Sequence, residues 1–257
     1  MRGVAGTHED IERVLALVSS GLSDYEAARR TGVPRSTVQN WRRGRLPKQP
    51  ALSNTVCAKC GGRTHEFTEL PASEYAYLLG QYLGDGTICR IGRSLRLSIS
   101  SDAQYEQIIH ECCDAIAMVR GRRPNVRMHQ TKRLAIIASY WRAWGCLFPQ
   151  HGSGRKHRRT IELVRWQLDI VERRPGQFLR GLIHSDGWRG INRVHVKGRT
   201  YEYPRYQFSN RSDDIRQLFV YACNLIGVAC RPWGKYHISV ARRDAVELLD
   251  QFVGSKR

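Results

Sequence analysis

Acidic residues are scarce in this sequence of 257 residues. Asp and Glu number 23 against 42 Lys and Arg, which gives a formal net charge of +19 at pH 7. Lysine is scarce as well, because only seven of the basic residues are Lys and 35 are Arg. An excess of this size points to a polyanionic partner, of which nucleic acid is the commonest. Arginine suits such a partner because its guanidinium makes bidentate contacts with phosphate and guanine.

Long hydrophobic runs are absent. No apolar stretch approaches the roughly 18 residues that a membrane helix needs, and the first residues lack the apolar core of a signal peptide. We therefore expect a soluble, cytoplasmic, nucleoid-associated protein that makes no membrane contact. In a reducing compartment the eight Cys are expected to be core residues or metal ligands rather than disulfides.

Residues 22–44, LSDYEAARRTGVPRSTVQNWRRG, have the spacing of a helix-turn-helix. Ser23 or Asp24 can cap a first helix, and Gly32 marks the turn before a second helix over about residues 34–43. We expect residues 1–50 to form a small all-α DNA-binding domain. The polar side chains that would contact bases and phosphates in the major groove are Arg35, Ser36, Thr37, Gln39, Asn40, Arg42 and Arg43.

Residues 51–70 are interpreted as a linker that contains one C-x-x-C pair. Cys57 and Cys60 are two thiols that a tight turn could aim at one metal ion, and His65 follows closely as a candidate third ligand. The sequence holds no second C-x-x-C pair. Two alternatives therefore remain open, a bound Zn²⁺ and a pair of thiols that bind no metal.

Two short stretches repeat one another, LLGQYLGDG at 78–86 and LRGLIHSDG at 179–187. Each places small residues four apart on one helical face, Gly80 with Gly84 and Gly181 with Ser185, which predicts two helices packed with their backbones unusually close.

The closely packed helices would bring Asp85 and Asp186 together in their last turns. Two such carboxylates repel each other unless a cation lies between them, and oxygen ligands suit a hard ion such as Mg²⁺ or Mn²⁺. This arrangement is typical of metal-assisted phosphodiester hydrolysis.

Alternating apolar and polar residues after each repeat predict hairpins with one buried face. Leu97, Val194 and Val196 are among the residues expected to point inward, and helices are expected to begin at Ser101 and Ser212. The opposite, almost acid-free face is expected to contact DNA. Its candidate residues are Arg96, Ser98, Arg193, His195, Lys197, Arg205, Gln207, Lys235 and His237.

Residues 70–257 resemble the LAGLIDADG homing endonucleases in their two-motif, single-chain form, on the strength of the two repeated stretches. Leu83 and His184 stand where that family usually has an acidic residue. The resemblance implies an α+β fold, a pseudo-symmetric double αββαββα domain at 71–257 with halves at about 71–165 and 166–257, after the small all-α helix-turn-helix domain.

The same resemblance implies a monomeric, site-specific, metal-dependent endonuclease that cuts both strands of double-stranded DNA, with Asp85 and Asp186 as catalytic metal ligands. Residues 159–161, Arg-Thr-Ile, are similar to a Lys-x-Ile-Pro segment of the family. Arg159 or Lys156 is therefore a candidate cation for stabilising the transition state. Two other functions stay open: a transcription regulator that binds DNA without cutting it, and an RNA splicing cofactor.

Overall fold

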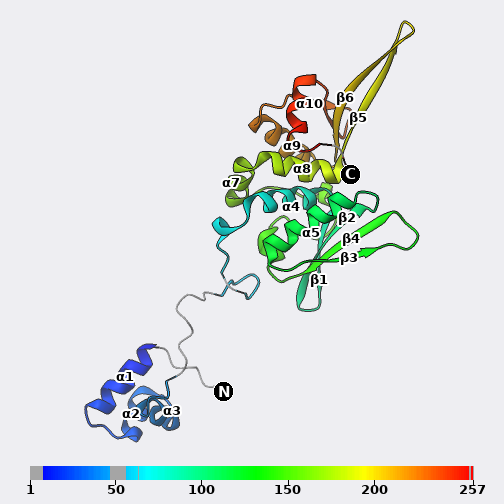
Figure 1. Ribbon diagram of the computed structural model, residues 1–257. Helices are drawn as coiled ribbons and strands as arrows, with labels where there is room; N and C mark the ends of the chain where they lie inside the picture. The colour runs from blue at the N-terminus through cyan, green and yellow to red at the C-terminus, as the bar shows by residue number, and fades with distance from the viewer. Residues whose placement is uncertain (1–7, 47–55, 63, 255, 257) are drawn as a thin grey trace. The chain divides into compact units, whose positions relative to one another are not determined.

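The structure is a computed structural model that describes residues 8–46, 56–62, 64–254 and 256 (Figure 1). The chain divides into two compact units, residues 1–55 and 56–257. Residues 51–55 and 63 of the predicted linker lie outside the described residues, as do residues 1–7 and 47–50 of the predicted N-terminal domain. No helix in the described ranges is long and apolar enough to cross a membrane.

The N-terminal unit contains three helices, α1 (His8–Ser19), α2 (Asp24–Thr31) and α3 (Arg35–Arg42). Ser23 caps α2 in a capping box with Glu26, which satisfies backbone donors at the start of the helix. Gly32 ends α2 with a φ of +74°, a left-handed conformation that glycine adopts without a steric cost. Val38 and Trp41 of α3 are buried in the small core of this unit, which leaves the polar face of α3 outside.

The larger unit consists of two halves with the same element order, αββαββα, as predicted. The first half contains α4 (Ala72–Asp85), β1 (Gly86–Ile91), β2 (Ser94–Asp102), α5 (Glu106–Arg120), β3 (Asn125–Met128), β4 (Leu134–Tyr140) and α6 (Trp144–Leu147). The second contains α8 (Pro175–Asp186), β5 (Gly187–Val196), β6 (Arg199–Ser209), α9 (Asp213–Leu225), β7 (Arg231–Trp233), β8 (His237–Val240) and α10 (Arg243–Asp250). Outside this repeated order lie η1 (Phe67–Glu69), η2 (Lys156–Arg158) and α7 (Arg165–Arg173).

Each half builds one antiparallel four-stranded sheet, and the two sheets have equivalent strand orders, β1-β2-β4-β3 and β5-β6-β8-β7. The register is equivalent too, since Gly86 pairs with Ile99 in the first half and Gly187 pairs with Phe208 in the second. The chain therefore repeats one supersecondary unit, and the predicted α+β fold class is confirmed.

One continuous hydrophobic core runs through both halves. Leu97 and Ile99 of β2, and Tyr206 and Phe208 of β6, are fully buried beneath the helices. Helices α4 and α8 lie side by side at the centre of the unit (Figure 1). Each sheet thus buries one face under helices, and its other face is not covered by helices.

The helix predicted to begin at Ser101 begins later, because β2 continues through that residue. Ser100, Ser101 and Asp102 pair with β4, so their backbone groups are satisfied by the sheet ladder, and α5 starts only at Glu106. In the second half the expectation holds, since the Ser212 hydroxyl accepts from the backbone N–H of Ile215 at the start of α9.

The inward direction expected for Val194 and Val196 is wrong. Their side chains are 38% and 47% exposed, because the β5–β6 hairpin extends beyond the helices and has no core to cover there (Figure 1). The strand register places Arg193 and His195 on the same side of the hairpin as Tyr206. In the rest of the sheet this side faces the helices, where Tyr206 is buried. Arg193 pairs with Glu202 across the strands, and His195 contacts Thr200.

Candidate active site

The two repeated helices meet where both have glycine. A Cβ atom added to Gly80 would lie 2.5 Å from the carbonyl oxygen of Phe178 and 2.7 Å from the backbone nitrogen of Leu182, both in α8. One turn later a Cβ atom on Gly84 would lie 2.1 Å from the Ser185 hydroxyl oxygen. No larger residue fits at these contacts, so the small residues set the distance between the helices.

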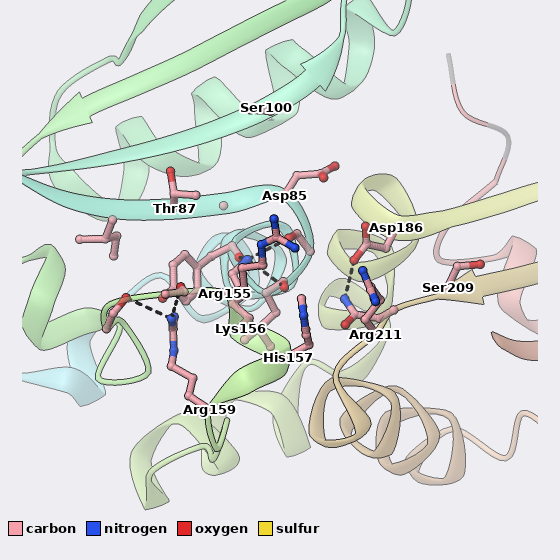
Figure 2. A pocket seen from close by; sticks show the side chains of 18 of the residues that line it. Asp85, Thr87, Ser100, Arg155, Lys156, His157, Arg159, Asp186, Ser209 and Arg211 are labelled. Carbon is pink, nitrogen blue, oxygen red and sulfur yellow. Dashed lines mark hydrogen bonds between the residues drawn. The ribbon is translucent and has the colours of Figure 1, made fainter. Parts of the chain in front are cut away.

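Because the helices are in register, their last residues reach the same place. Helix α4 ends at Asp85 and α8 ends at Asp186, and each is followed directly by a strand. Both aspartates line one open cavity of about 920 Å³ between the two halves, as Figure 2 shows. The structure thus brings together the two residues that the sequence repeat singles out.

The two carboxyl groups have unusual electrostatics. Burial raises the pKa of Asp85 to about 6, and the nearby negative charge of Asp186 adds to this shift. Burial also raises the pKa of Asp186, although the Asn210 side-chain amide donates a hydrogen bond of 2.6 Å to its carboxylate. The positive charges of Lys156 and Lys256 oppose both shifts. A partly buried pair of carboxylates is a donor set that suits a hard divalent cation.

Lys156 lies on η2 and caps the end of α4. Its ammonium group donates to the carbonyl oxygens of Tyr82, Leu83 and Gly84 at 2.5, 3.0 and 2.8 Å. Burial lowers the pKa of Lys156 to about 8, while the two aspartates act in the opposite direction. Lys156 therefore neutralises the negative end of the helix dipole beside Asp85.

Arg159 lines the same cavity but also contacts backbone. Its guanidinium donates to the carbonyl oxygens of Gly152, Ser153 and Gly154 at 3.0, 3.3 and 2.8 Å. These bonds hold the loop of residues 152–154 against the Arg159 side chain. Lys156 and Arg159 therefore both line the cavity. Their N–H groups donate to backbone carbonyl oxygens and hold the neighbouring backbone in place. The exposed side chains of Arg155 and Arg211 line the cavity as well (Figure 2).

Two residues at the site were missed by sequence reasoning, Asn210 and Lys256. Lys256 donates to the carbonyl oxygen of Ser185 at 3.2 Å, so it contacts the end of α8 much as Lys156 contacts the end of α4. Burial lowers its pKa, and Asp85 and Asp186 oppose this shift. The internal repeat contained the signal, since Lys156 and Lys256 follow their aspartates at nearly the same interval.

The two residues that replace acids in the repeat face the protein interior. Leu83 is fully buried, and His184 is 6% exposed. Burial lowers the pKa of His184 to about 4, and its Nδ1 lies 3.1 Å from the Tyr77 hydroxyl. His184 is therefore a neutral core residue.

Comparisons with known proteins yielded the following similarities. A family model of homeodomain-like domains matches residues 10–45. Among solved structures, mesophilic variants of the homing endonuclease I-DmoI are 15% identical, with a TM-score of 0.47 over 72% of this chain and 97% of that chain. The LAGLIDADG homing endonuclease I-LtrWI bound to target DNA is 7% identical, with a TM-score of 0.46 over 70% of this chain and 84% of that one.

The homing endonuclease I-WcaI bound to its DNA recognition sequence is 15% identical, with a TM-score of 0.47 over 72% of this chain and 81% of that one. No curated protein sequence matches the chain. At these identities and TM-scores the likeness carries no argument about the site, so its chemistry has to come from this chain's own residues.

The uncovered faces of the two sheets carry polar groups without partners. Arg96 on β2 and Arg205 on β6 occupy equivalent positions, and the Nε atom of each is buried without a hydrogen bond among the described residues. The hydroxyl groups of Ser98 and Ser239 are also buried and have no hydrogen-bond partner among the described residues. Unsatisfied polar atoms of this kind are uncommon in folded proteins.

The remaining sheet residues of the predicted interface are placed differently. Gln207 donates toward Nδ1 of His237 at 2.9 Å, and His237 lines the cavity. Lys235 lies in the turn before β8, with its ammonium group 5.3 Å from the ring centre of Tyr236. Lys197 is at the tip of the β5–β6 hairpin with a φ of +48°. Arg193 and His195, described above, are on the other side of that hairpin.

In the N-terminal unit, α3 presents most of its predicted contact residues to solvent. Thr37 and Gln39 are half-buried, and Arg42 forms an ion pair of 3.1 Å with Asp24 of α2. The exposed residues are Arg35, Ser36, Asn40, Arg42 and Arg43.

The structure also brings Cys57, Cys60 and His65 together, away from the aspartates. A fourth residue, Cys146 of α6, joins them. Nothing in the local sequence pairs Cys146 with the C-x-x-C, because the contact spans 89 positions of the chain.

Proposed function

We propose that the protein is a metal-dependent, site-specific endonuclease that cuts both strands of DNA. The observation that carries this proposal is the pair Asp85 and Asp186, held at the ends of two glycine-packed helices in one open cavity. The same cavity is bordered by Arg155, Lys156 and Arg211, whose positive charges suit a phosphate backbone.

The residues present fit a Mg²⁺ or Mn²⁺ ion. Asp85 and Asp186 would hold it, because both offer carboxylate oxygens and their raised pKa values show an unfavourable charge that a cation would relieve. When bound, such an ion supplies a Lewis acid that activates water and stabilises the leaving oxygen of a phosphodiester.

The surrounding side chains position the carboxylates. The Asn210 amide donates to Oδ2 of Asp186 and thereby orients the carboxylate. Lys156 and Lys256 fix the last turns of α4 and α8 through backbone carbonyls. Their positive charges also favour the ionised form of the aspartates, which binds a metal ion, and so oppose the effect of burial on the two pKa values. Lys156 and Lys256 are therefore positioning residues in this proposal.

The uncovered sheet faces would bind the DNA duplex. The Nε atoms of Arg96 and Arg205 have no hydrogen-bond partner among the described residues, and neither do the hydroxyls of Ser98 and Ser239. Groups of this kind gain a partner when base edges or phosphates approach. Because the arginines occupy equivalent strands of the two halves, they would contact the two halves of one recognition site.

The N-terminal unit would add a second DNA contact. The exposed face of α3 combines Arg35, Asn40 and Arg43, side chains that can contact phosphates and base edges in a major groove. This unit is also the feature that favours the second candidate, a DNA-binding regulator without cleavage.

The decisive experiment starts from DNA fragments selected by the purified full-length protein. The parent protein is expected to cut them in Mg²⁺ or Mn²⁺ and to bind them intact in EDTA. Asp85→Asn and Asp186→Asn should each remove most cleavage, because Asn keeps the shape but lacks the charge that retains the ion. Both should retain binding. Asp114→Asn, at an exposed position on α5, serves as the control and should cut normally.

A parent protein that binds one DNA site tightly and never cuts it in either metal would support the regulator and overturn the proposal. Selection of RNA in preference to duplex DNA would support the splicing cofactor instead.

A further inference from the structure

The segment before α4 forms a compact cluster with α6. Cys57, Cys60, His65 and Cys146 each place one ligand atom within 4.8 Å of the other three. Cys60 and Cys146 are buried, and Cys57 and His65 are half-buried. The cluster belongs to the larger unit and shares no residue with the cavity that holds the aspartates.

Two of the six ligand–ligand distances match the edges of a metal-centred tetrahedron, and all six are within 4.8 Å. With Zn–S bonds of about 2.3 Å and Zn–N bonds of about 2.0 Å, tetrahedral angles give S···S edges of about 3.8 Å and S···N edges of about 3.5 Å. The Sγ atoms of Cys57 and Cys146 are 3.7 Å apart, and Sγ of Cys60 is 3.3 Å from Nε2 of His65. A disulfide between Cys57 and Cys146 would need about 2.05 Å.

The backbone around the C-x-x-C pair is folded to present two thiolates to one ion. The N–H of Gly61 donates to the Cys57 carbonyl at 2.7 Å, and Gly61 has a φ of +66° that closes the turn. The N–H of Gly62 donates to Sγ of Cys60 at 3.4 Å. Such N–H donors stabilise negative charge on sulfur.

Arg142 supplies the charge balance. Three thiolates and one divalent ion leave one net negative charge, and the Arg142 guanidinium lies over the turn at Gly61, where an added Cβ would meet its Nη2 at 3.2 Å. The arrangement is thus balanced in charge and closed on all four sides by protein ligands.

We infer that Cys57, Cys60, His65 and Cys146 bind one structural Zn²⁺ ion that ties the C-x-x-C turn and His65 to α6. Three thiolates and one imidazole in a tetrahedron are a ligand set typical of structural zinc sites, and four protein ligands leave no open position for a substrate. The ion therefore acts on the fold and not on the chemistry at Asp85 and Asp186.

The consequence for the fold follows from where the ligands lie. Cys146 is next to Leu147, whose carbonyl oxygen accepts a hydrogen bond of 2.5 Å from the Tyr75 hydroxyl of α4. Phe67, just after His65, stacks on Trp166 with ring centres 4.2 Å apart. The zinc site and this stack together fix the segment that leads into the first repeated helix.

The first test is metal content and thiol protection in the full-length protein. Purified protein is expected to contain one zinc per chain. Alkylation mapped by mass spectrometry should spare Cys57, Cys60 and Cys146, and a chelator should expose all three together. Cys230, which is half-buried and outside the cluster, is an internal control whose labelling should not depend on the chelator.

The second test identifies Cys146 as a ligand. Protein loaded with Co²⁺ in place of zinc should show the visible bands of a tetrahedral thiolate complex, with charge-transfer intensity for three thiolates. Cys146→Ser should reduce that intensity by about a third or lose the metal, and Cys146→His should keep the metal with two thiolates. Tryptic cleavage after Lys59 should become faster on zinc removal.

Protein with no bound zinc would overturn the inference, and so would alkylation of Cys146 that ignores the chelator while Cys57 and Cys60 respond. Because zinc content and labelling are read without any nuclease assay, failure of this inference is separate from failure of the proposed function.

Discussion

A Cβ atom on Gly181 would lie 3.0 Å from the Cα atom of Gly80, so the two repeated helices touch backbone to backbone. The same added atom would be 2.1 Å from the carbonyl oxygen of Tyr77. This contact is what places Asp85 and Asp186 side by side one turn later. The spacing of the aspartates is therefore a product of packing between two glycines.

Gly181→Ala should destabilise the larger unit by at least about 2 kcal/mol, because the extra methyl meets backbone atoms that cannot move aside. The measurement is chemical denaturation of the variant against the parent. Gly152→Ala is the control, since its added Cβ would meet nothing nearer than the Arg159 side chain at 3.6 Å. Equal stability of Gly181→Ala and the parent would mean that the helices are not in this contact.

Asp85→Asn should stabilise the metal-free protein above neutral pH. Burial raises the pKa of Asp85 from 3.8 to about 6, so the fold favours the protonated form, and stability falls as pH rises through this window. The variant carries no such charge and should be more stable than the parent by about 1–3 kcal/mol at pH 8 in EDTA.

The advantage of Asp85→Asn should vanish near pH 4, where the parent carboxyl is also protonated, and should shrink when Mg²⁺ is added. Asp114→Asn, at an exposed position on α5, is the control variant. A variant less stable than the parent at pH 8 in EDTA would contradict the unfavourable charge pair.

DNA affinity should fall steeply with salt. If about 8 to 10 phosphates are neutralised, the logarithm of the association constant should fall with a slope of about −7 to −9 against the logarithm of salt concentration. A binding titration at several salt concentrations measures this slope, and a value shallower than about −3 would exclude the proposed sheet surface.

Arg205→Ala should weaken DNA binding, with a slope shallower by about 1 if Arg205 contacts a phosphate. Arg243→Ala is a matched control, because Arg243 is exposed on α10 and pairs with Glu247. Equal effects from the two substitutions would show that the sheet face is not the binding surface.

A fragment of residues 56–257 should fold and should cut DNA at high protein concentration with weaker target binding. The physical reason is that this unit contains the entire hydrophobic core around α4 and α8 and both aspartates. Thermal unfolding tests the folding, and cleavage titrations test the activity. A folded fragment that never cuts at any concentration would show that the N-terminal unit takes part in the chemistry.

Local features of this protein were determined by the sequence itself. The glycines and aspartates of the repeat, the Ser23 cap and the Gly32 turn follow from backbone hydrogen bonding and helical periodicity, which act over a few residues. The repeat then predicted two equivalent halves, because two segments with the same pattern of apolar, polar and small residues favour the same supersecondary structure.

Other features were decided only by tertiary structure. Strand pairing extended β2 through Ser101, and the lack of a covering helix left Val194 and Val196 exposed on a long hairpin. Chain packing brought Cys146 to the C-x-x-C pair and Lys256 to the aspartates across long stretches of sequence. Such contacts depend on how helices and sheets pack, and local periodicity contains no information about which distant side chains that packing brings together.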